Sequence, residues 1–400
     1  MNRYEKQFWE WVVRHRLKFL AAAATLFSLY ARYALRGLIS ADMRDCLFPW
    51  YDAIRSGGGF RSLSAQVGDY NIPYQTLIAF MTCFPIKREY AYKILSALFD
   101  YALGGAVAAG VYDLSKSRLK SVLAYTVTVM LPVTVLNSAA WGQCDSIYTF
   151  FIVAAFVSLM RGKHTAAFLL YGTALAFKLQ AVFFLPFLLF YYVRSRKFSG
   201  WRFLLLPVPP LVLSAGGLLQ GRGIRDVFGI YLDQTSKYTR ISLNYPSFWN
   251  LLVENNVKDG SDHYPELYIF CMMAAVIALA CLIVRLIQQK ELNAGTHLLT
   301  AAAMMHICVL FLPAMHERYA YPVLIFAVFA CFLHYEILPA ALGLLIIDLQ
   351  TYGQYLFGTE TMPWVFLVMA NILCCLWLLF ITVRKTCTQE REENSGRKGS

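Results

Sequence analysis

The feature that most constrains the fold is a series of apolar runs, several of them long enough to cross a lipid bilayer. A helix rises about 1.5 Å per residue, so about twenty apolar residues cross a hydrocarbon core of about 30 Å. Hydrophobic residues make up 58% of the chain and charged residues only 15%, which is more apolar surface than a soluble domain of 400 residues can bury. The alternation over about ten residues that is typical of membrane barrels is absent. We therefore expect an all-α, polytopic integral membrane protein.

The apolar runs predict about twelve transmembrane helices. The first begins at Phe19, after a basic N-terminal segment. No small-residue cleavage site precedes the charged loop that follows it, so we interpret this run as a retained span and not as a removed signal peptide. The other runs fall at 94–113, 120–138, 145–160, 164–179, 181–193, 202–219, 265–286, 297–313, 319–334, 337–349 and 363–383.

The Lys and Arg residues of the short connections predict the orientation. With a cytoplasmic N-terminus, the basic residues gather on the cytoplasmic side, at Lys116, Arg118, Lys120, Arg161, Lys163, Arg194, Arg196, Lys197, Arg202, Arg285, Lys290, Arg384 and Lys385. The stretch 70–93 has a short apolar core between Pro73 and Pro85, and counting it as a span would put most of these residues outside. We therefore place it in the outer interface as an amphipathic or re-entrant helix.

This topology predicts a single membrane domain, residues 1–383, in the cell membrane, with both termini in the cytoplasm. Its first extracytoplasmic loop, at about 39–93, is expected to carry interfacial helices. The polar segment 384–400 is expected to form a disordered cytoplasmic tail. The excess of Lys and Arg in the predicted cytoplasmic connections, together with this tail, explains the net charge of +12. No nucleic-acid partner is therefore expected.

Unusual polar residues gather at the outer ends of the predicted spans. A charge at membrane depth is costly, so such residues are by default candidates for function. Lys178 is the clearest case, because its apolar neighbours set it near the membrane and it then needs an anionic partner. The stretches concerned are "SADMRD", "VGDYNIPY", "AAWGQCDSIY", "FKLQ", "LPAMHERYAYP" and, in a long external loop at about 220–264, "SKYTRISLNYPSFWN".

Several of these residues have a purely structural alternative. Arg32 and Arg36 can extend to the outer headgroups, Asp100 and Asp348 can be paired packing residues, and His306 can be a satisfied core histidine. The stretch "WGQCD" can be a helix exit with an aromatic anchor and an acid that caps the next span. The stretch "HERY" can be an internally neutralised loop.

The ordered series of motifs resembles a known family. The chain is similar to integral-membrane glycosyltransferases of the C type, and specifically to bacterial proteins related to the mannosyltransferases of GPI-anchor synthesis. The resemblance covers residues 40 to about 322. The motifs that carry it are "SADMRD", "PWYDAIRSGGGF", "GDYNIPY", "KILSALFD", "WGQCDSIY", "FKLQAVFFLPFLL" and "MHERYAYP".

The resemblance implies an activity and a division of roles. It implies inverting transfer of a hexose, with mannose as the family's sugar, from a polyprenyl-phosphate-linked donor at an extracytoplasmic site. By match to the family's first external loop, the catalytic acid is Asp42, with Asp45 second; Ala41 stands where the family often has Gly. We expect Asp42 to be the general base, with three roles open for Asp45: sharing this role, orienting the acceptor, or being the base itself. Two nearby acids of this kind titrate as a pair. The acceptor, a glycan, a lipid or a protein, is not identified.

The remaining motif residues are expected to bind substrate in the same cavity, next to membrane lipid. Some would bind sugar hydroxyls, aromatic residues would stack on the sugar ring, and cations would offset the charge of the leaving phosphate. A divalent metal is an open alternative, but no ligand spacing indicates one, so no metal site is assigned. These residues are Asp69, Tyr70, Asn71, Trp141, Gln143, Asp145, Lys178, Gln180, His316, Glu317, Arg318 and Tyr319.

Two other functions use similar residues. A transporter or flippase of lipid-linked sugars would need the same cations and an apolar groove, but transporters tend to place coupling groups near the midplane on broken helices in two related halves. A polymerase or ligase of surface glycans would share the donor but not this motif series. The position of the polar residues at the outer ends favours the glycosyltransferase.

Overall fold

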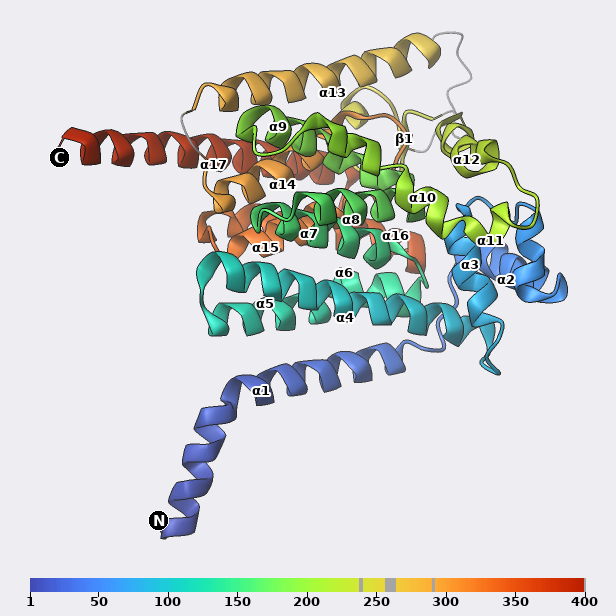
Figure 1. Cartoon of the computed structure of the whole chain (residues 1–400), viewed down its shortest axis with the longest axis horizontal. Coiled ribbons are helices and arrows are strands. Elements are labelled where there is room, and N and C mark those ends of the chain that lie inside the picture. Colours follow the sequence, from blue (N-terminus) through green and yellow to red (C-terminus); the bar gives the residue numbers. More distant parts are fainter. Residues whose placement is uncertain (237–239, 256–263, 290–291, 399–400) are drawn as a thin grey trace.

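Long helices lying side by side form the body of the molecule in the computed structural model (Figure 1). The structure describes residues 1–236, 240–255, 264–289 and 292–398. Within these residues the only strands are β1 (Ser242–Leu243) and β2 (Met315–His316), which pair in parallel. The predicted all-α class is therefore confirmed. Parts of the predicted external loop at 220–264, namely 237–239 and 256–263, lie outside the described residues.

The first half of the chain alternates long helices with short helical segments. The α-helices are α1 (Arg3–Ala34), α2 (Phe48–Ser56), α3 (Ile72–Met81), α4 (Arg88–Ser115), α5 (Arg118–Met130), α6 (Pro132–Val135), α7 (Asp145–Met160), α8 (His164–Phe177) and α9 (Leu185–Ser195). Two π-helices, η1 (Met43–Leu47) and η3 (Leu136–Ala140), and two 3₁₀-helices, η2 (Gly59–Ser64) and η4 (Leu179–Phe184), lie between them.

The second half follows the same plan. Its helices are η5 (Gly200–Leu205), α10 (Val208–Leu213), α11 (Ala215–Leu218), α12 (Ile224–Ser236), η6 (Phe248–Leu251), α13 (Tyr264–Ile287), α14 (Ala294–Phe311), α15 (Tyr321–Cys331), η7 (Tyr335–Ile337), α16 (Leu338–Phe357) and α17 (Trp364–Lys398). Helix α17 continues beyond Arg384 into the segment that the sequence predicts to be a disordered tail. The limits of the domain and of this tail stay a prediction.

Several helices are long and apolar enough to cross a membrane. Among the described residues four qualify: Arg88–Ser115, Pro265–Ile287, Ala294–Phe311 and Trp364–Thr386. A fifth forms if α5 and the Pro132–Ala140 segment, which meet at a bend of 47°, are counted as one span. The ring of Pro132 removes a backbone donor at this bend. Other predicted spans correspond to shorter apolar helices such as α7, α8 and α15.

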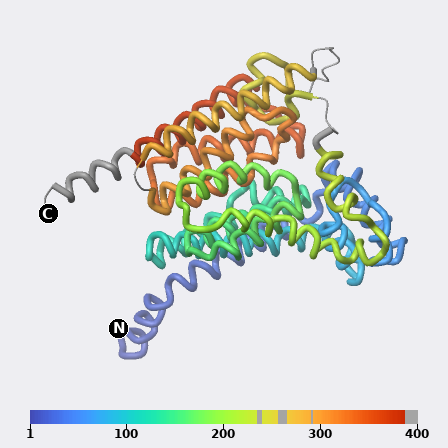
Figure 2. Tube along the Cα trace, turned by 45° about the horizontal axis from the view of Figure 1, so that its top comes forward, coloured from blue at the N-terminus to red at the C-terminus, as the bar shows by residue number. Residues whose placement is uncertain are grey.

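The two ends of the bundle differ. Short helices α2, α3, α11 and α12 gather at one end, and both chain termini lie toward the other (Figures 1 and 2). The segment between α1 and α4, predicted to be a loop with interfacial helices, contains η1, α2, η2 and α3. At ten residues, α3 is too short to cross a bilayer. The chain thus brings its first loop to the end of the bundle that is remote from its termini.

The centre and the rim of the bundle bury different shares of their apolar side chains. In α14, 83% of the most apolar window is buried, whereas in α13 the share is 17%. Helix α13 lies at the edge of the bundle (Figure 1) and exposes large apolar residues such as Phe270 and Ile277. A helix that is apolar all round and exposed on its outer side is typical of contact with lipid.

A buried ion pair ties α1 to the bundle. Arg32 is only 7% exposed, and its Nη2 lies 2.7 Å from Oδ2 of Asp100 in α4, which is fully buried. Arg32 also donates to the carbonyl of Val129, and Ser146 donates to Asp100. The interpretation of Arg32 as a headgroup-seeking residue is therefore wrong, because its partner lies inside the protein. Asp100 is a paired packing residue.

We predict that Arg32→Met destabilises the folded protein by about 3–5 kcal/mol, because it leaves the carboxylate of Asp100 buried without its cation. Thermal unfolding in detergent measures the effect. Arg36→Met is the matched control, since Arg36 is exposed in the turn that follows α1. Equal melting temperatures for the two variants would contradict the prediction.

Candidate functional site

The carboxylate of Asp42 accepts hydrogen bonds from four donors in three different parts of the chain. Its Oδ2 accepts from Trp141 Nε1 at 2.8 Å, from Gln143 Nε2 at 2.7 Å and from Arg318 Nη1 at 3.2 Å. Its Oδ1 accepts from the hydroxyl of Tyr355 at 2.6 Å. The Asp42 side chain is still 22% exposed. One oxygen is thus held by three donors, while the other accepts one and has room for a second.

Local backbone geometry orients Asp42 and the side chains that donate to it. Asp42 precedes the π-helix η1, and Trp141 follows the π-helix η3; such wide turns often occur at functional sites because they redirect side chains. Between Trp141 and Gln143 lies Gly142, whose φ of 71° belongs to the left-handed region that favours glycine. A Cβ there would also lie 3.1 Å from the sulfur of Met43. The glycine lets both neighbours donate to one oxygen.

Arg318 connects Asp42 to a second acid, Asp145. Its Nε lies 3.8 Å from Asp145 Oδ2, and its Nη1 lies 3.1 Å from Glu317 Oε1. The Arg318 side chain is 15% exposed, whereas both of these acids are buried. The guanidinium therefore lies among three carboxylates and is the central cation of the site.

Lys178 finds its anionic partner inside the protein. Its Nζ forms an ion pair with Asp145 Oδ1, and both side chains are buried. The other oxygen of Asp145 accepts from Asn137 Nδ2 at 2.8 Å. The rings of Tyr148 and Tyr319 lie 5.5 and 5.9 Å from Nζ, within the range of cation–π attraction.

The ends of two helices reinforce this ion pair. Asp145 is the first residue of α7, and Lys178 is the residue that caps the C-terminus of α8. A helix N-terminus carries partial positive charge and a C-terminus partial negative charge, so each side chain has the sign that its helix end favours. The chain reverses between α7 and α8, and this places both helix ends at the same end of the bundle.

The "HERY" and "VGDYNIPY" motifs complete the cluster. The ring of His316 lies 4.9 Å from that of Tyr319, and its Nδ1 is 3.9 Å from Glu317 Oε2. The short pairing of β2 with β1 holds His316 opposite Leu243. Tyr70 donates its hydroxyl to Gln143 Oε1 at 3.3 Å. Residues from the first loop and from the segment before α15 thus meet around one carboxylate.

The surroundings of Asp42 and Arg318 keep both groups charged. Burial alone raises the pKa of Asp42, but the Arg318 guanidinium and the hydrogen bonds from Tyr355 and Trp141 outweigh it and hold this pKa below its ordinary value. Burial disfavours charged Arg318, but Asp42 and Glu317 hold its pKa well above the ordinary value. Three acids face two permanent cations here, with His316 as a third cation when it is protonated.

Four residues predicted for the site lie apart from this cluster. The side chain of Asp45 is 66% exposed and faces its neighbour Arg44, with 3.6 Å between the charged atoms. Asp69 is exposed, and its carbonyl accepts from Gln234. Asn71 is buried and donates to the carbonyl of Ala176. Gln180 is half-buried at the start of η4 and donates no hydrogen bond to the cluster. Of the two candidate bases, only Asp42 joins the constellation.

Sequence reasoning missed Tyr355, which donates to Asp42, and Asn137 and Tyr352, which support Asp145. Asn137 also donates to the hydroxyl of Tyr352 at 3.0 Å. The ring of Tyr355 stacks on Trp141 with 4.4 Å between centroids. A signal was present, because Asp348, Tyr352 and Tyr355 are spaced by four and three residues and share one face of a helix.

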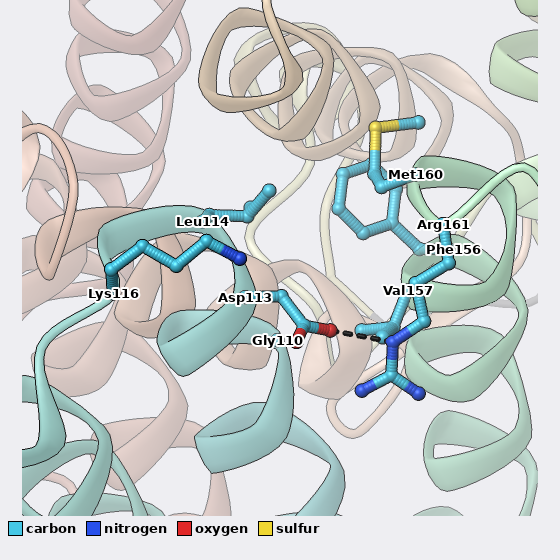
Figure 3. A pocket seen from close by; sticks show the side chains of 8 residues that line it. All are labelled: Gly110, Asp113, Leu114, Lys116, Phe156, Val157, Met160 and Arg161. Carbon is cyan, nitrogen blue, oxygen red and sulfur yellow. Dashed lines mark hydrogen bonds and ion pairs between the residues drawn. The ribbon is translucent and has the colours of Figure 1, made fainter.

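A pocket of about 210 Å³ lies far from this cluster (Figure 3). Asp113 and Arg161, which line it, form an ion pair at 2.6 Å. The cluster meets α4 at Ser96, whose hydroxyl donates to Gln143 O. Seventeen residues of helix separate Ser96 from Asp113, which corresponds to about 25 Å. The pocket therefore belongs to the opposite end of the bundle, and Lys116 adds a second cation to its lining beside the Asp113–Arg161 pair.

Within the described residues, no group of three or more His, Cys, Asp or Glu side chains is arranged to hold a metal ion. In comparisons with known proteins, no protein-family model matches the chain, and no curated protein matches it.

We predict that Asp42 makes stability depend on pH in acid. Its pKa in the folded protein lies below its ordinary value, so its ionised form contributes stability above the unfolded pKa of about 3.9 and loses it as the pH falls through the folded value. The wild type should melt higher than Asp42→Asn at neutral pH, and the difference should shrink below about pH 4. Melting curves across this range measure it, and a constant difference would contradict the prediction.

Proposed function

We propose that this protein is a membrane glycosyltransferase that moves a hexose, with mannose as the first candidate, from a polyprenyl-phosphate donor to an extracytoplasmic acceptor. The observation that carries the proposal is the environment of Asp42. Its carboxylate is ionised and fixed, and it remains partly exposed at the end of a helical bundle. These are the properties that a general base for a hydroxyl nucleophile needs.

The proposed step is a single displacement. The oxygen of the acceptor hydroxyl attacks the anomeric carbon, the proton of the hydroxyl passes to Asp42 Oδ1, and the bond from the anomeric carbon to the phosphate oxygen breaks. Polyprenyl phosphate leaves with the electron pair, so the configuration inverts. Oδ1 is the better acceptor for the proton because it has one donor, whereas Oδ2 has three.

Arg318 is the candidate that offsets negative charge growing on the phosphate. It is the more exposed of the two permanent cations in the cluster, and a guanidinium fork matches phosphate oxygens. Lys178 was the first candidate from the sequence. Its ion pair with Asp145 favours a supporting role, in which it keeps that acid from competing with phosphate for Arg318.

An apolar groove supports a lipid-linked donor. It has a volume of about 470 Å³ and runs between α13, α14 and α17, where it is lined by residues such as Leu282, Ile307, Phe311 and Leu379. Phe311 lies four residues before Met315, where β2 begins, so one end of the groove approaches the "HERY" segment. A polyprenyl chain needs such a groove open to lipid.

The full topology belongs to the same proposal. We infer about twelve spans, with the shorter apolar helices completing those that are long enough on their own, and an orientation with both termini in the cytoplasm. Supporting this, the chain ends lie at the end of the bundle opposite to α2 and α3, the helices of the loop that carries Asp42 (Figure 1). We propose the cell membrane as the location of the protein, with the active site on the extracytoplasmic side.

We predict that Asp42→Asn lowers sugar transfer by about 10²–10⁴-fold, because an amide cannot accept the proton. Asp45→Asn, the other candidate base, should retain transfer. The measurement is turnover of synthetic polyprenyl-phosphate mannose by the reconstituted protein, together with envelope glycans of cells that carry each variant as their only copy. Normal turnover by Asp42→Asn would remove Asp42 from the mechanism. Export of intact lipid-linked sugar by that variant would indicate a flippase.

We predict that Tyr355→Phe moves the acid limb of the pH profile of kcat/KM upward by about one pH unit. Loss of the hydrogen bond to Oδ1 raises the pKa of Asp42, so the base is protonated over a wider range. Tyr335→Phe is the control, because Tyr335 is exposed in η7. An unchanged limb in Tyr355→Phe would mean that its hydroxyl does not tune the base.

A further inference from the structure

The N-terminal part of α1 leaves the bundle. Both views show it diverging from the helices that the rest of α1 follows, and in Figure 1 it runs steeply across their common direction. No residue before Ala24 is buried. The later part is fixed by side chains such as Thr25, whose hydroxyl lies 2.8 Å from that of Tyr125, and Ser28, which donates to the carbonyl of Val129. Residues 3–20 therefore form an exposed helix at the end of the bundle that holds the termini.

This exposed helix carries an aromatic stripe. Tyr4, Phe8, Trp11, His15 and Phe19 follow one another at spacings of four, three, four and four residues, which places them on one face. The rings contact each other along the face: Trp11 lies 5.0 Å from His15 and 5.3 Å from Phe19 between centroids. Tyr4, Phe8, Trp11 and Phe19 are all exposed. A soluble protein would leave so large an apolar face uncovered only at a site of interaction.

Charged residues occupy the other side of the same helix. Arg3, Lys6, Glu10 and Arg14 are spaced by three, four and four residues and lie opposite the stripe. Across residues 3–20, five basic residues stand against two acidic ones. An aromatic face opposed by a basic face is the pattern of a helix that lies in a membrane interface and prefers anionic lipid.

We propose that residues 3–20 lie along the headgroup layer of the leaflet at the terminal end of the bundle, with the aromatic stripe toward the acyl chains, and that they bind anionic phospholipid. The net positive charge of residues 3–20 favours anionic lipid as the partner. It disfavours a second copy of the chain, whose own helix carries the same positive charge. The direction of the segment across the bundle matches a helix in the plane of the membrane. The proposal rests on the bundle crossing a membrane and not on sugar transfer.

The experiment compares tryptic cleavage of the full-length protein in nanodiscs of phosphatidylcholine and of phosphatidylcholine with phosphatidylglycerol. Mass spectrometry follows cleavage after Arg14, Arg16 and Lys18. We expect cleavage of the wild type to be several-fold slower in the discs that contain phosphatidylglycerol. The variant F8S/W11S/F19S should lose this protection. The matched control V13S should keep it, because Val13 is exposed and lies on the side of the helix away from the stripe.

Three results would overturn the proposal. One is equal cleavage of the wild type in the two lipids. Another is equal protection of wild type and triple variant. The third is protection in detergent that increases with protein concentration, which would indicate a second copy of the chain. The melting temperature of the triple variant should equal that of the wild type, since no residue before Ala24 is buried; a lower value would mean that the segment packs on the bundle.

Discussion

The position of Arg318 between Asp42 and Asp145 is the interaction on which the rest of the site depends. Three acids sit within reach of this guanidinium, and two of them are fully removed from water. Buried charges of one sign are tolerated only when cations and donors compensate them. Arg318 compensates all three at once, and Lys178 adds a second cation to Asp145. The cluster therefore forms only when segments from the first loop to α15 are all in place.

This requirement explains how Asp42 stays ionised at the end of a bundle of apolar helices. Asp42 retains its charge because Arg318 and three hydrogen-bond donors offset the cost of burial, while partial exposure leaves one oxygen accessible. A fully solvated acid would be charged but not fixed. A fully buried one would need every lone pair satisfied and could accept no proton from a substrate. The observed environment lies between these limits: Asp42 is held by its donors and remains partly exposed, as the proposed role of general base requires.

The sequence predicted the helical class and most members of the cluster, because apolar runs and misplaced charges are local signals. Lys178 stands out beside apolar neighbours, whereas Asp42 was assigned by its match to a family motif. It could not decide between Asp42 and Asp45, since the wide turn at η1 determines which acid faces inward. It also missed Tyr355, because the spacing of Asp348, Tyr352 and Tyr355 shows only that they share one helix face and does not show which group that face meets. The count of spans depends on helices of ten to seventeen residues, for which length alone gives no answer.

Two ionic centres meet at the start of α7, and this links the Asp42 cluster to the anchoring of α1. Asp145 faces Lys178 and Arg318, while the next residue, Ser146, donates to Asp100, the partner of Arg32. Arg32 in turn fixes the end of α1, only ten residues before Asp42. The loop that carries Asp42 is therefore held at both sides by contacts to one helix start. The Arg32–Asp100 pair and the Asp42 cluster are thus joined through two consecutive residues, Asp145 and Ser146.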